Sequence, residues 1–154
     1  MSYLIVACAI GIGLVAGLRS LLAPAAVAWA VHLGWLPGIS LRFMGSKSVL
    51  VILSLLALAE LIADKLPGVP RRTAVLPLVA RIFSGGLCGA CVWISANQAL
   101  AIGAILGAFG ALTGAFVGYE VRRRLVSRVK LPDLLVALAE DAGAISLALF
   151  SVSR

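Results

Sequence analysis

Four long apolar stretches restrict the fold of this chain more than any other feature of its sequence. They cover residues 48–66, 74–95, 99–119 and 134–151, and charged side chains interrupt them at only a few positions. Each stretch is close to the roughly 20 residues that an α-helix needs to cross about 30 Å of hydrocarbon. The sequence therefore predicts an all-α, polytopic bundle of transmembrane helices.

The composition agrees with this class and excludes others. Of the 154 residues, 62% are hydrophobic and 12% are charged, whereas soluble domains have about 45–50% apolar and roughly 25% charged residues. This balance excludes a cytosolic globule and a disordered regulator. We expect a single integral membrane domain over residues 1–154, with several passes through the inner (plasma) membrane of the cell.

The N-terminal apolar segment needs a different explanation. Residues 3–36 as one helix would be roughly 51 Å long, which is too long for one span and too short for two spans and a turn. Arg19, Ser20 and Pro24 lie in its middle, and broken helices are tolerated inside a membrane where they line a protein cavity. We expect two short helices hinged near residues 18–24, which gives five or six membrane segments. The alternative is one span followed by an interfacial helix that ends at Trp35.

Basic residues predict the orientation of the chain. The connections 64–73 and 120–133 together carry eight Lys and Arg residues, whereas the opposite side carries three, which are Arg42, Lys47 and Arg154. Because an excess of Lys and Arg marks the cytoplasmic side, the C-terminus should be outside. The net charge of +7 is explained in this way without a nucleic-acid partner.

The second of these connections holds the densest basic cluster of the chain. It consists of Arg122, Arg123, Arg124, Arg128 and Lys130. The cluster is first of all a signal of orientation, and its cationic groups also suit the anionic head groups of membrane lipids. Membrane lipids are therefore the expected partners.

A short internal match suggests two related halves. Segments 57–60 and 137–140 both read Ala-Leu-Ala-Glu. Glycines upstream correspond loosely, namely Gly11, Gly13 and Gly17 with Gly103, Gly107 and Gly110. Since three crossings would separate the copies, halves 3–66 and 99–151, linked by helix 74–95, would form an inverted repeat like those of many secondary transporters. A chance match between segments rich in Ala and Leu is the alternative.

Glycines line two of the predicted spans at spacings of mostly three or four residues. They are Gly85, Gly86 and Gly89 in one span, and Gly103, Gly107, Gly110, Gly114 and Gly118 in the next. Small residues let helices approach closely, so we predict packing faces, within one subunit or between the subunits of a homo-oligomer. Cys88 and Cys91 have the CxxC spacing but no second Cys pair or nearby His, and we therefore expect no metal and no cofactor.

The charged residues within the apolar stretches are the best candidates for a functional site. They are Arg19, Glu60, Asp64, Arg81, Glu140 and Asp141, with Lys65 at the end of its span. An ionised side chain at the bilayer centre costs at least about 2.5–3.5 kcal/mol. At helical rise, Glu60, Glu140 and Arg81 lie roughly 8, 12 and 14 Å from the cytoplasmic face. This predicts one shared site, with Asp64, Asp141 and Arg19 at its edge.

Two interpretations of this cluster stay open. In the first, it forms a polar cavity that binds a charged solute or a lipid head group while one carboxyl group titrates. In the second, mutually satisfied ion pairs only fix the register of the helices. We favour the functional interpretation, because four acids exceed what the register requires.

Several of these motifs resemble one protein family. They are Gly17-Leu-Arg19 followed by Pro24, the stretch Glu60-Leu-Ile-Ala-Asp64-Lys65-Leu-Pro67-Gly68, Arg81 before a Gly/Ala run, and Glu140-Asp141 in the last span. Over nearly the whole chain they resemble a small bacterial integral-membrane family, domain of unknown function 4126. The resemblance implies a polytopic helical protein and gives weight to Glu60, Asp64, Lys65 and Asp141. It implies no established activity.

These observations favour a small transporter-like protein with an ionisable site near the cytoplasmic side, and with proton coupling through one carboxyl group. One alternative is an intramembrane lipid-processing enzyme that uses the same carboxylates. No Ser/His/Asp set, HExxH motif or paired-aspartate phosphotransferase pattern is visible in support of it. Another alternative is a non-transporting membrane assembly or stability factor, which the glycine faces would suit.

Overall fold

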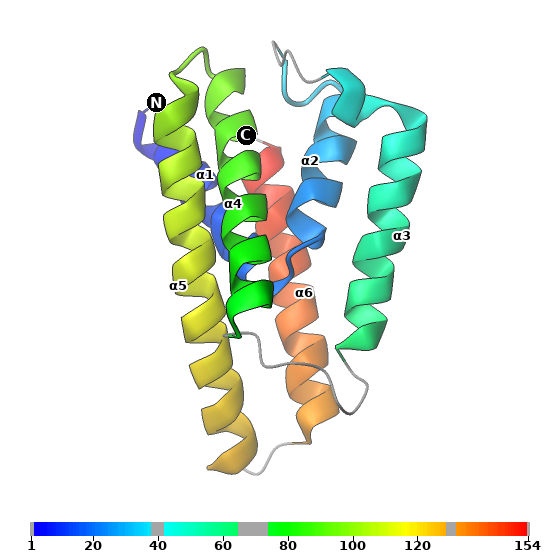
Figure 1. Cartoon of the computed structure of the whole chain (residues 1–154), viewed down its shortest axis with the longest axis vertical. Coiled ribbons are helices and arrows are strands. Elements are labelled where there is room, and N and C mark those ends of the chain that lie inside the picture. The colour runs from blue at the N-terminus through cyan, green and yellow to red at the C-terminus, as the bar shows by residue number, and fades with distance from the viewer. Residues whose placement is uncertain (1, 38–41, 65–73, 129–131, 154) are drawn as a thin grey trace.

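The fold is all-α, as the sequence predicts. The computed structural model describes residues 2–37, 42–64, 74–128 and 132–153, and these residues form helices and turns but no strand. The helices are α1 (Ser2–Leu18), α2 (Leu22–His32), η1 (Arg42–Gly45, a short 3-10 helix), α3 (Lys47–Ala63), α4 (Val75–Ser95), α5 (Leu100–Ser127) and α6 (Asp133–Val152). Figure 1 shows them as an elongated bundle with the chain termini near the same end.

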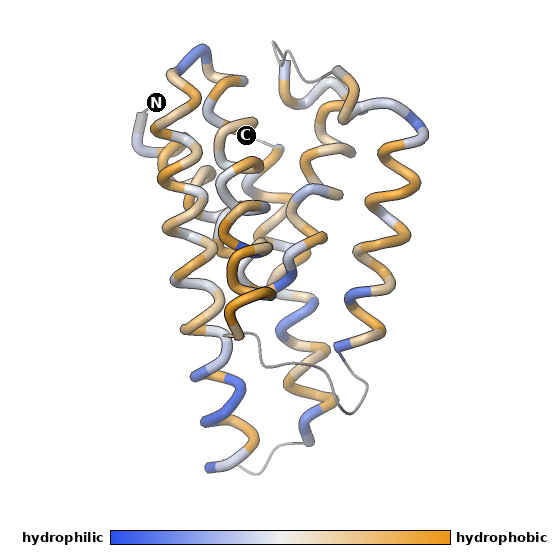
Figure 2. The backbone as a smooth tube through the Cα atoms, viewed as in Figure 1, coloured by the Kyte–Doolittle hydropathy of each residue, from blue (hydrophilic) through white to orange (hydrophobic). Residues whose placement is uncertain are grey.

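The bundle is that of a membrane protein. Among the described residues, α4, α5 and α6 are long and apolar enough to cross a membrane, and α1 and α2 are shorter apolar helices. Figure 2 shows apolar residues along most of the bundle and hydrophilic ones gathered at the lower ends of α3, α5 and α6. The 28 residues of α5 span about 42 Å. This helix therefore extends beyond the hydrocarbon at its basic end.

The N-terminal segment is broken inside the interval that the sequence predicts. α1 ends at Leu18 and α2 begins at Leu22, and the chain reverses direction between them, so both helices lie in the upper part of the bundle (Figure 1). α2 buries Ala23, Val27 and Ala30 completely, so it packs within the bundle. This packing agrees with two short helices hinged at the break.

Pro24 supplies the physical reason for the break. Proline has no N–H group and its ring clashes with the carbonyl four residues earlier, so it is tolerated only in the first turn of a helix. Pro24 lies in the first turn of α2. A helix running through residue 24 would leave the carbonyl group of Ser20 without its donor, and the chain leaves helical geometry at this point.

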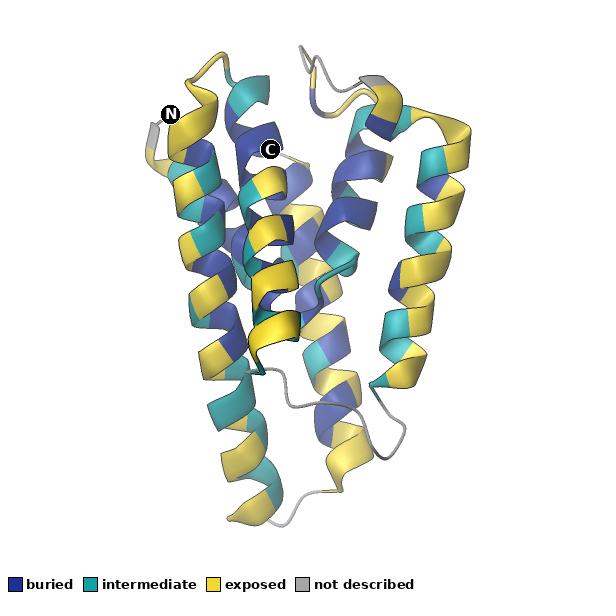
Figure 3. Cartoon of the chain, in the orientation of Figure 1, coloured by how far each residue is buried: buried dark blue, intermediate teal, exposed yellow. Residues whose placement is uncertain are grey.

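α1 lies at the centre of the bundle and packs against α4, α5 and α6. Its residues Ile12, Val15 and Ala16 are fully buried, as Figure 3 shows for the interior faces of the helices. Glycines allow this close packing, because a methyl group added at Gly13 would overlap the carbonyl oxygen of Gly107. A methyl group added at Gly107 would in turn overlap the carbonyl oxygen of Gly85.

The helix directions bear on the proposed repeat. Gly13 faces Gly107, and Gly17 faces Ala111 one turn further along both helices. α1 and α5 therefore run in the same direction, and their glycines do not describe an inverted pair. α3 and α6, which contain the two Ala-Leu-Ala-Glu segments, run in opposite directions (Figure 1).

α3 is the least embedded of the long helices. It begins after Ser46, whose hydroxyl oxygen accepts a hydrogen bond from the Val49 N–H group. It packs mainly on α2 and η1, and only Leu50 and Ala57 are buried along it. Its apolar side chains face outward over much of its length (Figure 3). The contacts at its charged end therefore contribute much of its attachment to the bundle.

Candidate functional site

The candidate site surrounds the break between α1 and α2. Arg19 is the first residue after α1, and none of its side-chain surface is exposed. Its guanidinium group forms an ion pair with Asp64 at the end of α3, where Nη1 lies 2.6 Å from a carboxylate oxygen. Its Nε and Nη2 atoms donate hydrogen bonds of 2.8 and 2.6 Å to one oxygen of Asp141 on α6. Arg19 thus joins the helix break to two other helices.

The charges continue toward the exposed end of the bundle. Arg122 on α5 donates a hydrogen bond of 2.9 Å to Asp64 and holds Asp133 through its Nε and Nη2 atoms, at 2.9 and 2.8 Å. We call the five residues Asp141, Arg19, Asp64, Arg122 and Asp133 the charge chain. Their charges alternate in sign along this order.

The charge chain leads from the interior to the surface. The exposed fraction of the side chain is 0% at Arg19 and 13% at Asp64. It is 19% at Arg122 and 58% at Asp133. The site therefore reaches the end of the bundle where the basic residues gather.

Glu60 binds the start of α2. One of its oxygens accepts hydrogen bonds of 2.8 and 2.7 Å from the N–H and hydroxyl groups of Ser20, and the other accepts one of 2.8 Å from the Leu21 N–H group. The first N–H groups of a helix have no partner within it and carry a partial positive charge. A carboxylate from α3 therefore replaces the missing partners inside the bundle.

Arg81 binds the end of α1. Its Nη1 atom donates hydrogen bonds to the carbonyl oxygens of Gly17 and Leu18, and Arg81 is itself buried on α4. One turn later on α4, the Ser84 hydroxyl donates a hydrogen bond to the carbonyl oxygen of Ser20. This is the carbonyl group to which Pro24 cannot donate, because proline has no N–H group. Two side chains of α4 thus satisfy the backbone that the break exposes.

The arrangement corrects the prediction in one respect. The sequence places Arg81 at the centre of the cluster and Arg19 at its edge, whereas in the structure Arg19 holds the two aspartates. The rise of a helix predicts the depth of Arg81 along α4 but not the direction in which its side chain points. In the structure the side chain reaches the carbonyl oxygens at the end of α1. Lys65 lies outside the described residues.

Glu140 lines a cavity outside the helix break. It is half-buried on α6 and lies in the wall of a cavity between α5 and α6, together with Arg122 of the charge chain. Glu60 contacts the helix break and does not line this cavity.

The basic end of α5 carries further ion pairs. Arg123 and Arg124 both pair with Glu120, at 2.8 and 2.7 Å, and the hydrogen bonds from Arg124 and then Arg123 lower the pKa of this exposed carboxyl group. The hydrogen bonds to Asp133, followed by that to Asp64, raise the pKa of Arg122, against a smaller lowering by burial. These groups are therefore ionised at neutral pH. Lys130 lies outside the described residues.

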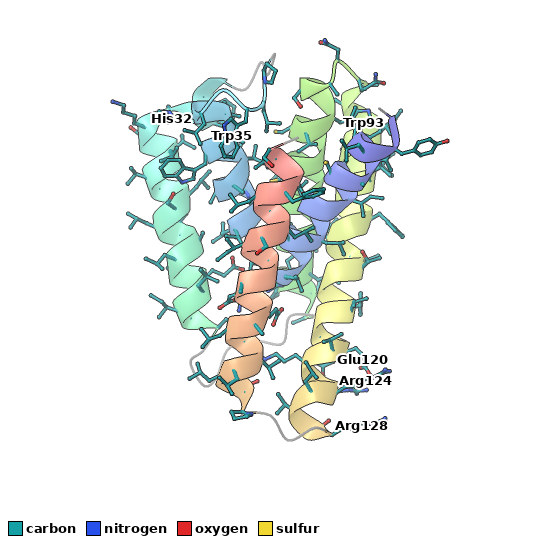
Figure 4. All side chains as sticks on the ribbon, turned by 180° about the vertical axis from the view of Figure 1, so that it is seen from behind. His32, Trp35, Trp93, Glu120, Arg124 and Arg128 are labelled. Atoms are coloured by element: carbon teal, nitrogen blue, oxygen red, sulfur yellow. The ribbon has the colours of Figure 1, made fainter. Side chains whose placement is uncertain are left out.

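Cysteine and histidine residues lie at the edge of the site or away from it, and the Cys88 thiol forms a hydrogen bond with Ser84. Cys88 and Cys91 are buried thiols in the contact region of α4, and His32 lies at the other end of the bundle, where Nδ1 is 3.0 Å from the Gly45 carbonyl oxygen (Figure 4). In the parts of the chain that the structure describes, no three His, Cys, Asp or Glu side chains are placed to hold a metal ion.

Sequence reasoning missed three participants, which are Ser84, Arg122 and Asp133. Ser84 is a small polar residue in apolar surroundings, and nothing in its spacing marks it as a partner of the break. The sequence identifies Arg122 only as a member of the basic cluster. Its position three residues beyond the end of a predicted span, opposite the acidic ends of two others, is the signal that could have identified it.

Comparison with known proteins agrees with the resemblance of the motifs. The model of the family described as "Domain of unknown function (DUF4126)" matches residues 6–153. The chain therefore belongs to this family. No curated protein and no solved structure matches the chain.

Proposed function

We propose that this member of the DUF4126 family is a small transporter-like membrane protein that binds a charged solute or lipid head group at Arg19. The observation that supports the proposal is a helix broken within the bundle, with a buried arginine and two aspartates at the break. Secondary transporters commonly bind their substrates at such discontinuous helices. Ionisable residues inside a membrane are also typical of ion and proton pathways.

The charge chain suggests the sign of the ligand. Arg19 is the buried cation to which Asp64 and Asp141 both bind, so an anionic ligand would replace one carboxylate on its guanidinium group. A guanidinium group suits carboxylates and phosphates because it donates two parallel hydrogen bonds. The exposed end of the charge chain, at Arg122 and Asp133, provides the route from the basic side of the membrane.

Displacement of a carboxylate would couple the ligand to a proton. A carboxylate that loses its arginine while it remains buried is stabilised by taking up a proton from water, because burial disfavours its charged form. The anion would then enter together with a proton. Binding of one anion together with one proton leaves the net charge of the site unchanged.

α3 is the element that would move. It carries both Glu60 and Asp64, four residues apart on one face, and these two acids hold it to the helix break. Farther along, it contacts α2 through the hydrogen bond of 3.1 Å from the Trp29 ring to the Ser54 hydroxyl. Release of Asp64 would loosen a helix that has few other buried contacts.

The proposal can be tested by proton uptake when an anion is added. The purified chain is reconstituted in vesicles in a weakly buffered solution at neutral pH, sodium sulfate is added, and proton uptake is measured with a pH indicator. We expect uptake in the wild type that Asp141→Asn reduces about tenfold, because an amide cannot take up the proton. Glu120→Gln, on the exposed part of α5, is the matched control and should leave the signal unchanged.

Two results would overturn the proposal. One is a wild-type signal no larger than that of vesicles without protein. The other is an equal signal in Asp141→Asn and wild type. Either would favour the interpretation in which the ion pairs only fix the register of the helices.

A further inference from the structure

A second feature of the molecule lies between α5 and α6, outside the helix break. These two helices make few contacts with each other, and a groove of about 720 Å³ separates them. α1 provides its floor through Leu14 and Leu18. Sites for small molecules have volumes of about 300–1,000 Å³, so the groove is large enough for one.

The lining of the groove is apolar along its length and charged at one place. Val117, Val121 and Leu135 line it and remain largely exposed, so the groove is open to the hydrocarbon of the membrane. Its charged residues are Arg122 and Glu140. A ligand that fits this lining has a long apolar part and a polar end.

Gly143 indicates that the groove is kept open. A methyl group added at most helical glycines of this chain would overlap the backbone of a neighbouring helix, whereas at Gly143 it would meet nothing within 4 Å. Close packing therefore does not explain this glycine. Its position in the wall of the groove explains it, because any larger side chain would occupy the space.

The charge at the end of the groove indicates the kind of polar group. Arg122 lies where α5 leaves the hydrocarbon, and the same turn of the helix continues with Arg123 and Arg124, followed by the exposed Arg128. Figure 4 shows Glu120, Arg124 and Arg128 projecting from this extension on the side away from α6. Arg122 is therefore the cation that lines the groove, together with Glu140. The other basic residues contribute positive charge at this end of α5, of the kind that attracts anionic head groups on the cytoplasmic side.

We propose that the groove between α5 and α6 is a binding site for an anionic phospholipid. An acyl chain lies along the apolar lining past Gly143, and the phosphate group takes the place of the exposed Asp133 carboxylate on Arg122. The two donors of Arg122 that now hold Asp133 suit two phosphate oxygens in the same way. The site shares Arg122 and Asp133 with the charge chain, but lipid binding there does not require Arg19 to bind a transported ligand.

Native mass spectrometry of the detergent-purified chain tests the site. The probes are phosphatidylglycerol and phosphatidylcholine with identical acyl chains. We expect one phosphatidylglycerol to bind about tenfold more tightly than phosphatidylcholine, because only the first has a net negative charge. Gly143→Leu should weaken its binding about tenfold by filling the groove.

A neighbouring substitution provides the control. Ala142→Leu adds the same side chain to the exposed, adjacent position of α6, which does not line the groove, and it should leave binding unchanged. Equal binding of the two lipids, or equal binding by Gly143→Leu and wild type, would overturn the proposal. A wild-type dimer that Gly143→Leu converts to a monomer would also overturn it, since the occupant would then be a second copy of the chain.

Discussion

Arg19 donates two hydrogen bonds to a single carboxylate oxygen of Asp141, a residue 122 positions further along the chain. Both side chains are buried. The pair therefore fixes the break of the first helical segment against the last helix of the bundle. Because Arg19 also pairs with Asp64, one guanidinium group determines how three separate segments meet.

Loss of this guanidinium group should destabilise the fold. Arg19→Gln removes the guanidinium group from Asp141 and leaves Asp64 with Arg122, and removal of one partner from a buried ion pair costs about 3–5 kcal/mol. Thermal unfolding in detergent should show a large fall in midpoint. Arg19→Lys should fall in between, because a single ammonium group cannot hold both carboxylates with the same geometry.

A double variant tests whether the loss of stability in Arg19→Gln comes from the charge of Asp141. Adding Asp141→Asn to Arg19→Gln also removes the negative charge that Arg19 holds in the wild type, and the midpoint should partly recover. If the double variant is less stable than Arg19→Gln alone, the cost of the single change does not come from the charge of Asp141.

The break was predictable from the sequence, whereas the centre of the site was not. A run of 34 apolar-rich residues fits neither one span nor two, and Pro24 limits where the break can lie. The rise per residue of a helix also predicted the depths of Glu60 and Arg81. It could not give the direction in which Arg81 points, because this depends on where α1 ends in space. Asp133 was missed because it lies next to a loop, where a carboxylate needs no special explanation.

Glu60 should contribute to folding as well as to any activity. Glu60→Gln keeps the size of the side chain, but an amide has only one acceptor oxygen. Its nitrogen must therefore face either Ser20 or Leu21, and it cannot accept the hydrogen bond that the wild-type oxygen accepts there. An unsatisfied buried group costs about 1–3 kcal/mol, and the unfolding midpoint should fall accordingly. An unchanged midpoint would contradict the role of Glu60 at the start of α2.

Glu120→Gln is the matched control for Glu60→Gln. Glu120 is ionised at neutral pH, because Arg124 and Arg123 lower its pKa, but its pairs lie on the exposed extension of α5. Exposed ion pairs contribute about 0–1 kcal/mol, and the midpoint should hardly change. Equal losses of stability in the two variants would contradict the capping role of Glu60.

Arg81→Ala should impair folding for a reason that the sequence did not reveal. The substitution removes the donor that serves the Gly17 and Leu18 carbonyl oxygens, and the end of α1 would lose its partners. Arg81→Lys keeps one donor group and should retain part of the stability. Amide hydrogen exchange should increase first in the last turn of α1. An increase confined to α3 would instead indicate that Arg81 acts through the acids.

The glycines of the bundle should differ sharply in their tolerance of alanine. Gly107→Ala places a methyl group against the carbonyl oxygen of Gly85 and forces α4 and α5 apart, at a cost of about 1–3 kcal/mol for overpacking. Gly143→Ala meets open space and should be neutral or stabilising, because alanine favours the helix by about 1 kcal/mol. Similar midpoints for both variants would show that the α4–α5 contact is not close-packed.

The two termini of the chain should label from outside the cell. Both lie near the end of the bundle opposite the basic extension of α5 (Figure 1), because the first segment turns back and the four helices α3 to α6 follow it. The eight basic residues of the connections 64–73 and 120–133 predict that those connections are in the cytoplasm. A cysteine added before Ser2 or after Arg154, in a chain whose native cysteines are replaced by alanine, should react with an impermeant thiol reagent in intact cells. Ser127→Cys, at the exposed end of α5, should react only after permeabilisation. The reverse pattern would mean that the basic residues do not set the orientation, and labelling of only one terminus would contradict the turn at Arg19.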